Sequence, residues 1–223
     1  MAVALYVSNE ITIVSSMVCC WAYLYKQRWR YLKRRPLVAT TILIVLTVLT
    51  FGLQLAYPEV LYALRRDAVA MRSGEWWRLI TPLFVQPSGV GQFGFNLLFL
   101  AVFLPMGERI YGARIWLLYF VPGLVGQFVN FWWDPHGGGS SPAIFGVMGS
   151  VLVYVLVHRK EAPKQYWWFA LAGLLGAVLM CFARSGHGPS LLAGAMLGAL
   201  LCRASRKEQP DTALEAVAES AGV

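Results

Sequence analysis

Long apolar runs, separated by short polar or basic segments, dominate this sequence of 223 residues. A helix needs roughly 20 mostly apolar residues to cross a bilayer, because lipid offers no partner to an exposed backbone group. Hydrophobic residues make up 58% of the chain and charged residues only 13%. A soluble domain of this size cannot bury so much apolar surface. The sequence therefore predicts an all-α protein that crosses a membrane several times.

Six runs have the length and composition of membrane-spanning helices. They lie at residues 37–57, 90–106, 115–133, 141–157, 166–182 and 187–201. A further run at residues 5–25 carries Asn9 and Glu10 near its start. This run can cross the membrane or lie in its interface, and we prefer the crossing. The expected architecture is a six-helix transmembrane bundle with one further helix at its N-terminus.

The basic residues predict how the bundle is oriented. If the spans alternate in direction, 14 of the 19 Lys and Arg residues share one side of the membrane. These residues are Lys26, Arg28, Arg30, Lys33, Arg34, Arg35, Arg109, Arg114, Arg159, Lys160, Lys164, Arg203, Arg206 and Lys207. The side richer in Lys and Arg is the cytoplasmic one. We therefore interpret the net charge of +8 as a sign of membrane orientation. We expect a multi-pass protein of the plasma membrane and no nucleic-acid partner.

Composition divides the chain into three predicted segments. Residues 1–36 form an apolar helix and a basic cytoplasmic linker, and residues 37–203 form the transmembrane core. Residues 204–223 are small and polar, so we expect a disordered cytoplasmic tail. Within the core, residues 58–89 form a long connection on the outer side that contains Trp76 and Trp77. Its amphipathic composition predicts that it lies in the membrane interface.

A glycine-rich segment directly precedes one predicted span at its outer end. Residues 134–142 read Asp-Pro-His-Gly-Gly-Gly-Ser-Ser-Pro. Backbone N–H groups at a helix N-terminus can stabilise developing negative charge, so Ser141 is a candidate nucleophile. Most such loops are ordinary turns and helix caps. The serine indicates catalysis only if a base lies on the same face.

The chain has three histidines, and their positions along the spans separate them. His158 lies 17 residues beyond Ser141, about 25 Å away at 1.5 Å per helical residue and therefore on the cytoplasmic side. His187 begins the last span, two crossings later, so it returns to the outer face. An imidazole at this depth needs a partner or water, which makes His187 the preferred base. His136, in a flexible loop, is a weaker candidate, and an interfacial role without catalysis is the plain alternative for His187.

Two amides on one span are further candidates. Gln92 and Asn96 are four residues apart and share one helix face near its outer end. Buried amide donors there can bind an oxyanion, but a hydrogen bond between helices explains them equally well.

Small residues mark one face of the last span. Ser190, Gly194 and Gly198 recur every four residues, a spacing that allows another helix to approach closely. If the partner is the Ser141 helix, with Gly146 and Gly149, the Ser141 hydroxyl and the His187 imidazole come within hydrogen-bond distance.

Five segments, in this order along the chain, resemble elements of the rhomboid intramembrane protease family. Residues 75–82 (Glu-Trp-Trp-Arg-Leu-Ile-Thr-Pro) resemble the WR element of the family, and residues 95–100 resemble its HxxxN helix. The segment from Gly107-Glu108-Arg109 through Gly112 resembles the turn that follows this helix. Residues 139–146 (Gly-Ser-Ser-Pro-Ala-Ile-Phe-Gly) resemble the GxSGAxxG motif, and the segment from His187 through Gly194 and Gly198 resembles the HxxGxxxG helix. The resemblance covers residues 37–201, nearly the whole predicted core.

The resemblance implies an intramembrane serine endopeptidase with a Ser–His dyad. Ser141 would be the nucleophile, and His187 would be the general base and then the acid, with no third acid. Phe145 would stack on the imidazole. The Ser141 N–H, Asn96 and Gln92 would hold the oxyanion, and no metal or cofactor would be needed. The implied partners are transmembrane protein substrates, which enter sideways from the lipid bilayer and have helix-weakening residues near the outer face.

Three positions depart from the family pattern and keep an alternative open. Gln92 stands where the family has a histidine, and Pro142 and Ser190 each replace a glycine. Proline suits the first turn of a helix but removes an N–H group. The alternative is a rhomboid-like pseudoprotease that binds transmembrane clients without cutting them. A transporter is disfavoured, because the spans carry almost no carboxylates at mid-depth.

Overall fold

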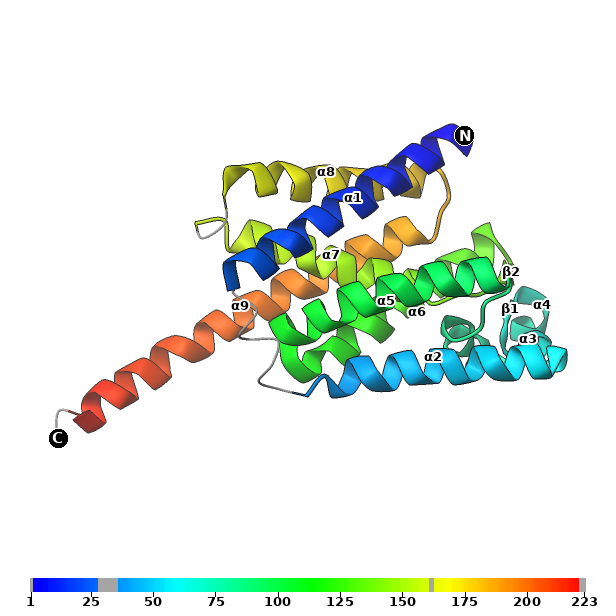
Figure 1. Ribbon diagram of the computed structural model, residues 1–223, viewed down its shortest axis with the longest axis horizontal. Coiled ribbons are helices and arrows are strands. Elements are labelled where there is room, and N and C mark those ends of the chain that lie inside the picture. The colour runs from blue at the N-terminus through cyan, green and yellow to red at the C-terminus, as the bar shows by residue number, and fades with distance from the viewer. Residues whose placement is uncertain (1, 28–35, 161–162, 221–223) are drawn as a thin grey trace.

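Helices form almost all of the structure, a computed structural model that describes residues 2–27, 36–160 and 163–220 (Figure 1). The long helices are α1 (Ala2–Gln27), α2 (Val38–Ala56), α5 (Val90–Tyr111), α6 (Ile115–Trp133), α7 (Ser141–Val157), α8 (Lys164–Phe182) and α9 (His187–Ser220). The short elements are α3 (Pro58–Leu64), α4 (Ala68–Arg72), the 3-10 turns η2 (Trp76–Leu79), η3 (Thr81–Leu83) and η4 (Gly112–Arg114), and the strands β1 (Arg66–Asp67) and β2 (His136–Gly137). The predicted all-α class is confirmed.

Every predicted apolar run corresponds to one long helix. α6 and α7 begin and end at the predicted residues, whereas α5 continues beyond residue 106 to Tyr111. Gly112 ends α5 because its φ of +59° is a conformation that glycine adopts without strain. α9 includes most of residues 204–223, and the division at residues 36 and 203 stays a prediction. Residues 28–35 of the predicted linker and 221–223 of the predicted tail lie outside the described residues.

Several helices have the length and apolar character of membrane spans. Within the described residues, three helical runs meet both conditions: Val38–Ala56, Val90–Trp133 and Lys164–Phe182. The apolar helix Ser141–Val157 is somewhat shorter. The run Val90–Trp133 consists of two helices, α5 and α6. Gln92 at the start of α5 donates a hydrogen bond to the Gly138 carbonyl just beyond the end of α6, so the start of one helix lies beside the end of the other and the two are antiparallel. Leu49, Trp168 and Phe182 are exposed on the outside of the bundle, as expected for side chains that face lipid.

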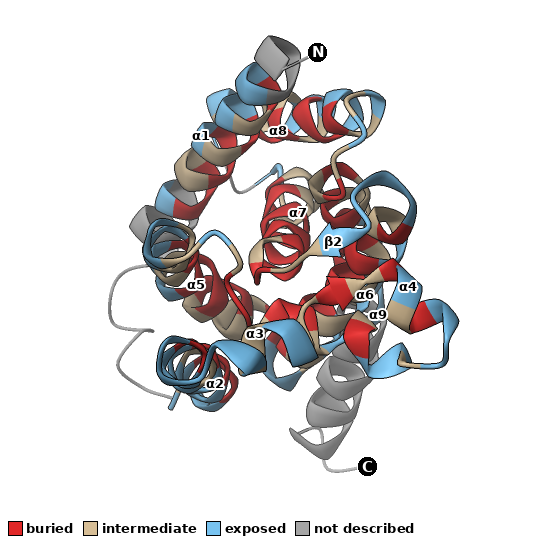
Figure 2. Ribbon diagram, turned by 90° about the vertical axis from the view of Figure 1, so that its right-hand side faces the viewer, coloured by how far each residue is buried: buried red, intermediate tan, exposed pale blue. Residues whose placement is uncertain are grey.

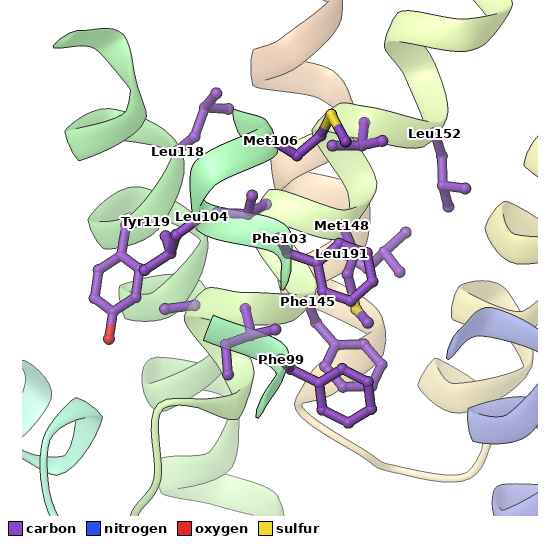
Figure 3. Close-up of a cluster of buried hydrophobic side chains, with 14 of the residues drawn as sticks. Phe99, Phe103, Leu104, Met106, Leu118, Tyr119, Phe145, Met148, Leu152 and Leu191 are labelled. Carbon is purple, nitrogen blue, oxygen red and sulfur yellow. The ribbon is translucent and has the colours of Figure 1, made fainter. Parts of the chain in front are cut away.

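α7 lies at the centre of the bundle, with the other long helices around it (Figure 2). All residues from 142 to 152 are buried. Its side chains Phe145 and Met148 pack in one cluster with Phe99, Phe103 and Leu191 (Figure 3). A helix that is apolar on every side belongs in the core of a protein or in contact with lipid, and here other helices cover it. The helix that begins at Ser141 is therefore packed on all sides by other parts of the protein.

The glycines of α7 and α9 let these two helices approach each other closely. A Cβ atom on Gly194 would overlap the Gly146 carbonyl, and one on Gly149 would overlap the Leu191 carbonyl. The predicted pairing of the small-residue face with the Ser141 helix is therefore correct for Gly194 and Gly198. Ser190 differs, because its hydroxyl lies against Gly126 of α6.

We expect the substitution Gly194→Ala to lower the thermal stability of the protein in detergent by several degrees. The added methyl group meets backbone atoms that cannot move aside, and overpacking of this kind costs about 1–3 kcal/mol. Gly52→Ala is the matched control, since a Cβ atom at Gly52 has no neighbour within 4 Å. Equal melting temperatures for the two variants would contradict the close α7–α9 contact.

The connection between α2 and α5 is folded onto the bundle. The Arg78 guanidinium is buried, and its Nη1 donates to the carbonyls of Tyr62 and Arg65, each at 2.8 Å. Strands β1 and β2 pair antiparallel, with Arg66 opposite Gly137 and Asp67 opposite His136. This pairing ties the connection to the glycine-rich segment before Ser141. Sequence reasoning did not predict the strands, because two residues are too few to show a period.

Candidate active site

The side chains of Ser141 and His187 meet at one end of the bundle. Ser141 is the first residue of α7 and His187 the first residue of α9. The hydroxyl Oγ of Ser141 lies 2.8 Å from Nε2 of His187. Their meeting depends on the close packing of α7 and α9, since the residues are 46 positions apart in sequence. The structure thus brings together the two residues that the sequence singled out.

The backbone before Ser141 is held in one conformation. Gly139 has a φ of +130° and donates its N–H to the Pro82 carbonyl at 2.7 Å. Residues with side chains rarely adopt this φ. Ser141 starts α7, and the N–H groups in the first turn of a helix have no partner within the helix. These groups, with the positive end of the helix dipole, form a place where negative charge is stabilised.

The His187 ring is held on three sides. The ring of Phe145, one turn beyond Ser141, lies with its centroid 4.6 Å from that of the imidazole. Nε2 faces the Ser141 hydroxyl, and Nδ1 lies 3.0 Å from the hydroxyl of Ser185. With the proton on Nδ1, the ring donates to Ser185 and accepts at Nε2 from Ser141. This tautomer is the one that a general base at Ser141 needs.

Gln92 and Asn96 lie beside the glycine-rich segment, as their shared helix face implied. A Cβ atom on Gly139 would be 2.5 Å from Gln92 Nε2 and 3.4 Å from Asn96 Nδ2. Each amide also donates a hydrogen bond to another part of the protein. Gln92 Nε2 donates to the Gly138 carbonyl at 3.0 Å, and Asn96 Nδ2 donates to Gln86 Oε1 at 2.8 Å. An amide nitrogen carries two N–H groups, so each can still donate a second hydrogen bond.

Two further glutamines, which sequence reasoning missed, support Asn96 from behind. Gln86 is fully buried, and its side chain lies between Asn96 and the hydroxyl of Ser140. The Gln54 side chain accepts from the Gln86 N–H at 2.9 Å and donates to the Gln86 carbonyl at 2.8 Å. This network links α2 to the site. A lone glutamine in a loop gives no periodic signal, so only the fold reveals it.

The other two histidines lie away from Ser141. His158 ends α7 at its far end, and its ring bonds the Tyr154 carbonyl at 3.0 Å. His136 was expected in a flexible loop, which is wrong, because it belongs to β2. Its Nε2 lies 3.9 Å from Asp67 Oδ1. The N–H of Ala70, together with that of Val69, also donates to Asp67 and holds the pKa of this carboxyl below its ordinary value.

Arg66 is a buried cation near the site. Its Nε donates to the Asp134 carbonyl and its Nη2 to the Asp134 carboxylate, both at 2.9 Å, and its Nη1 donates to Gln127. Burial lowers the pKa of this guanidinium, and the Asp134 carboxylate acts against that effect. Arg66 thereby fastens the end of α6 to β1 and fixes the start of the segment that leads to Ser141.

Comparison with known proteins decides the family. The family model described as the Rhomboid domain matches residues 73–206, more than half of the chain. This chain belongs to the rhomboid family. The predicted membership is confirmed, and this rhomboid is an integral membrane protein of all-α fold.

Three curated relatives of this rhomboid carry family names. The rhomboid protease GluP of Bacillus subtilis is 39% identical over 89 residues, 39% of this chain and 17% of GluP. The "Putative rhomboid protease YdcA" of the same organism is 34% identical over 122 residues, 52% of this chain and 60% of YdcA. The chloroplastic RHOMBOID-like protein 9 of Arabidopsis thaliana is 39% identical over 84 residues, 36% of this chain and 19% of that protein. This rhomboid thus spans less than two thirds of each of these relatives.

Proposed function

We propose that this chain is an intramembrane serine endopeptidase that cleaves transmembrane segments near the outer face of the membrane through a Ser141–His187 dyad. The observation that carries the proposal is the 2.8 Å separation between Ser141 Oγ and His187 Nε2. A hydroxyl next to an imidazole at a helix N-terminus is the arrangement that activates a serine nucleophile. The name of GluP as a rhomboid protease and that of YdcA as a "Putative rhomboid protease" support the same activity.

The proposed chemistry is acyl transfer in two steps. His187 Nε2 takes the proton from Ser141 as Oγ forms a bond with the scissile carbonyl carbon. The tetrahedral intermediate then breaks its C–N bond, and the imidazolium gives the proton to the leaving amine. A water molecule, deprotonated by the same imidazole, hydrolyses the acyl ester and restores Ser141. No metal or cofactor takes part in these steps.

Three donors are proposed to stabilise the oxyanion of that intermediate. They are the N–H of Ser141 and the second N–H groups of the Asn96 and Gln92 side chains. Both amide nitrogens lie next to Gly139, two residues before the nucleophile. Hydrogen bonds to Gln86 and Gly138 orient them before substrate arrives. Donors fixed in this way need no reorganisation at the moment of reaction.

We also propose the topology that this function requires. Six spans, α2 and α5–α9, form the core, and α1 is a seventh helix that packs on α8. For example, Thr12 Oγ1 of α1 donates to the Gly173 carbonyl of α8 at 3.4 Å. The basic loops face the cytoplasm of a plasma membrane. Arg109 and Arg114 lie where α5 meets α6, at the opposite end of α6 from Ser141, which supports an active site on the side away from these basic residues.

One alternative rests on specific residues. Pro142 follows the nucleophile directly and is buried, and Gln92 uses its Oε1 to accept from the Ser88 N–H at 2.9 Å. If these two departures from the family pattern leave the oxyanion without its donors, the protein binds transmembrane clients without cutting them.

Cleavage by purified protein in liposomes separates the two functions. We expect the wild type to cut a transmembrane rhomboid substrate near the outer face, with Pro142→Gly and Gln92→His raising the rate several-fold or less. An inert wild type that gains activity from either substitution would establish the pseudoprotease instead. Mapping the cut by mass spectrometry identifies the bond and thus its depth in the membrane.

A further inference from the structure

Ser185 is a polar residue next to the dyad that has no part in the family pattern described above. Its hydroxyl lies 3.0 Å from Nδ1 of His187, the ring nitrogen that faces away from Ser141. It comes from the turn between α8 and α9. The imidazole therefore has a serine hydroxyl at each nitrogen, one on α7 and one from this turn.

The backbone around Ser185 is fixed from both sides. Arg184, just beyond the end of α8, is in the left-handed conformation at a φ of +56°, and the Ser185 N–H donates to the Met180 carbonyl at 2.9 Å. This is the Schellman end of a helix. The Gly188 N–H in the first turn of α9 bonds the Ser185 carbonyl at 3.1 Å. A non-glycine residue in the left-handed region costs about 1–2 kcal/mol, so this turn is held in place by its surroundings.

A neutral imidazole can act as a base at only one of its two ring nitrogens. Such a ring has one N–H donor and one acceptor nitrogen, and only the form with the proton on Nδ1 leaves Nε2 able to take the Ser141 proton. Among the described residues, none of the hydrogen-bond partners of the ring is a carboxylate, and the charged group that acts on it is Arg66. The Ser185 hydroxyl is the group at Nδ1 that can accept a hydrogen bond from an Nδ1–H proton.

We propose that Ser185 is a positioning residue that fixes the tautomer and the orientation of His187. The inference rests on the proposed function, because tautomer and orientation affect catalysis only if His187 is the base. Ser185 touches neither substrate nor the scissile bond in this role. It acts through the ring, as the carboxylate does in serine proteases with a triad, but without adding a charge.

Kinetics of three variants test the proposal. Ser185→Ala removes the acceptor and is expected to lower kcat about tenfold with KM unchanged, the size of effect of one neutral hydrogen bond. Ser185→Thr keeps a hydroxyl and is expected to stay within about twofold of the wild type. Ser150→Ala is the control for the loss of a serine hydroxyl, since its Oγ bonds the Val147 carbonyl within α7. An unchanged kcat in Ser185→Ala, or an equal loss in Ser185→Thr, would overturn the inference.

A spectroscopic readout separates this inference from the proposed function. In a His136→Gln/His158→Gln background, His187 is the only imidazole of the chain. The ring nitrogen-15 shifts at neutral pH are expected to show the Nδ1–H form, and Ser185→Ala is expected to give a mixture of both tautomers. If the protein proves inert but the spectrum changes in this way, the positioning contact stands and the protease fails. If the protein cuts and the spectrum does not change, Ser185 has no positioning role.

Discussion

Replacing Ser141 or His187 by alanine is expected to lower the rate of substrate cleavage at least about 10³-fold, because each removes one half of a single proton-transfer unit. The distance of 2.8 Å between Oγ and Nε2 makes the two side chains interdependent. The double variant should therefore be no slower than either single variant. Cleavage of a transmembrane substrate in liposomes, measured at a substrate concentration below KM, gives the three rates.

Matched controls are available within the same chain. His158→Ala removes an imidazole at the far end of α7, and His136→Ala removes one from β2. Both variants are expected to cut within about twofold of the wild-type rate, since neither ring contacts Ser141. Normal cleavage by Ser141→Ala would show that the nucleophile is another residue. A large loss in His136→Ala would give that histidine the role assigned to His187.

The substitution Asn96→Ala is expected to lower kcat about 10²–10³-fold, the usual cost of removing one oxyanion donor. The effect should fall on kcat rather than KM, because the donor is needed only when the carbonyl oxygen becomes negative. Gln92→Leu tests the second amide and is expected to have a smaller effect, since Gln92 is only half buried. Single-turnover rates and melting temperatures of both variants are the measurements.

Gln86 provides the check on this prediction. It accepts a hydrogen bond from Asn96 but lies behind it, so Gln86→Leu should misalign the amide without removing it. We expect a loss of kcat smaller than that of Asn96→Ala. A loss of folding in Asn96→Ala, seen as a melting temperature far below that of the wild type, would assign Asn96 a structural role. An unchanged kcat would remove Asn96 from the oxyanion site.

Much of the fold could be predicted because a helix that crosses a membrane needs a long run of apolar residues. The ends of α6 and α7 were predicted to the residue, since an aromatic pair, Trp132-Trp133, and the glycine-rich segment mark the boundaries between apolar and polar chain. α5 was predicted too short because Gly107-Glu108-Arg109 through Gly112 was interpreted as a turn, whereas the helix continues to Tyr111. Gly107 is instead a packing position, where a Cβ atom would meet Ile115 Cδ1 at 2.6 Å.

The site was predictable only where it depends on helix ends. Counting crossings was enough to place Ser141 and His187 at one depth and to exclude His158. Gln54, Gln86 and Ser185 could not be found in this way, because they come from loops or from a helix that is distant in sequence. Their positions depend on backbone hydrogen bonds such as those of Gln86 with Gln54. The pair β1–β2, which fixes the segment before Ser141, follows from the same tertiary contacts.

Covalent labelling tests the central claim most directly. A fluorophosphonate probe reacts with a serine hydroxyl only where a base activates it and donors hold the resulting oxyanion. We expect mass spectrometry of the labelled wild type to find the phosphonyl group on Ser141, and we expect His187→Ala to remove the label while His158→Ala keeps it. A wild type that stays unlabelled at Ser141, or a label on Ser141 that persists in His187→Ala, would contradict the Ser141–His187 dyad.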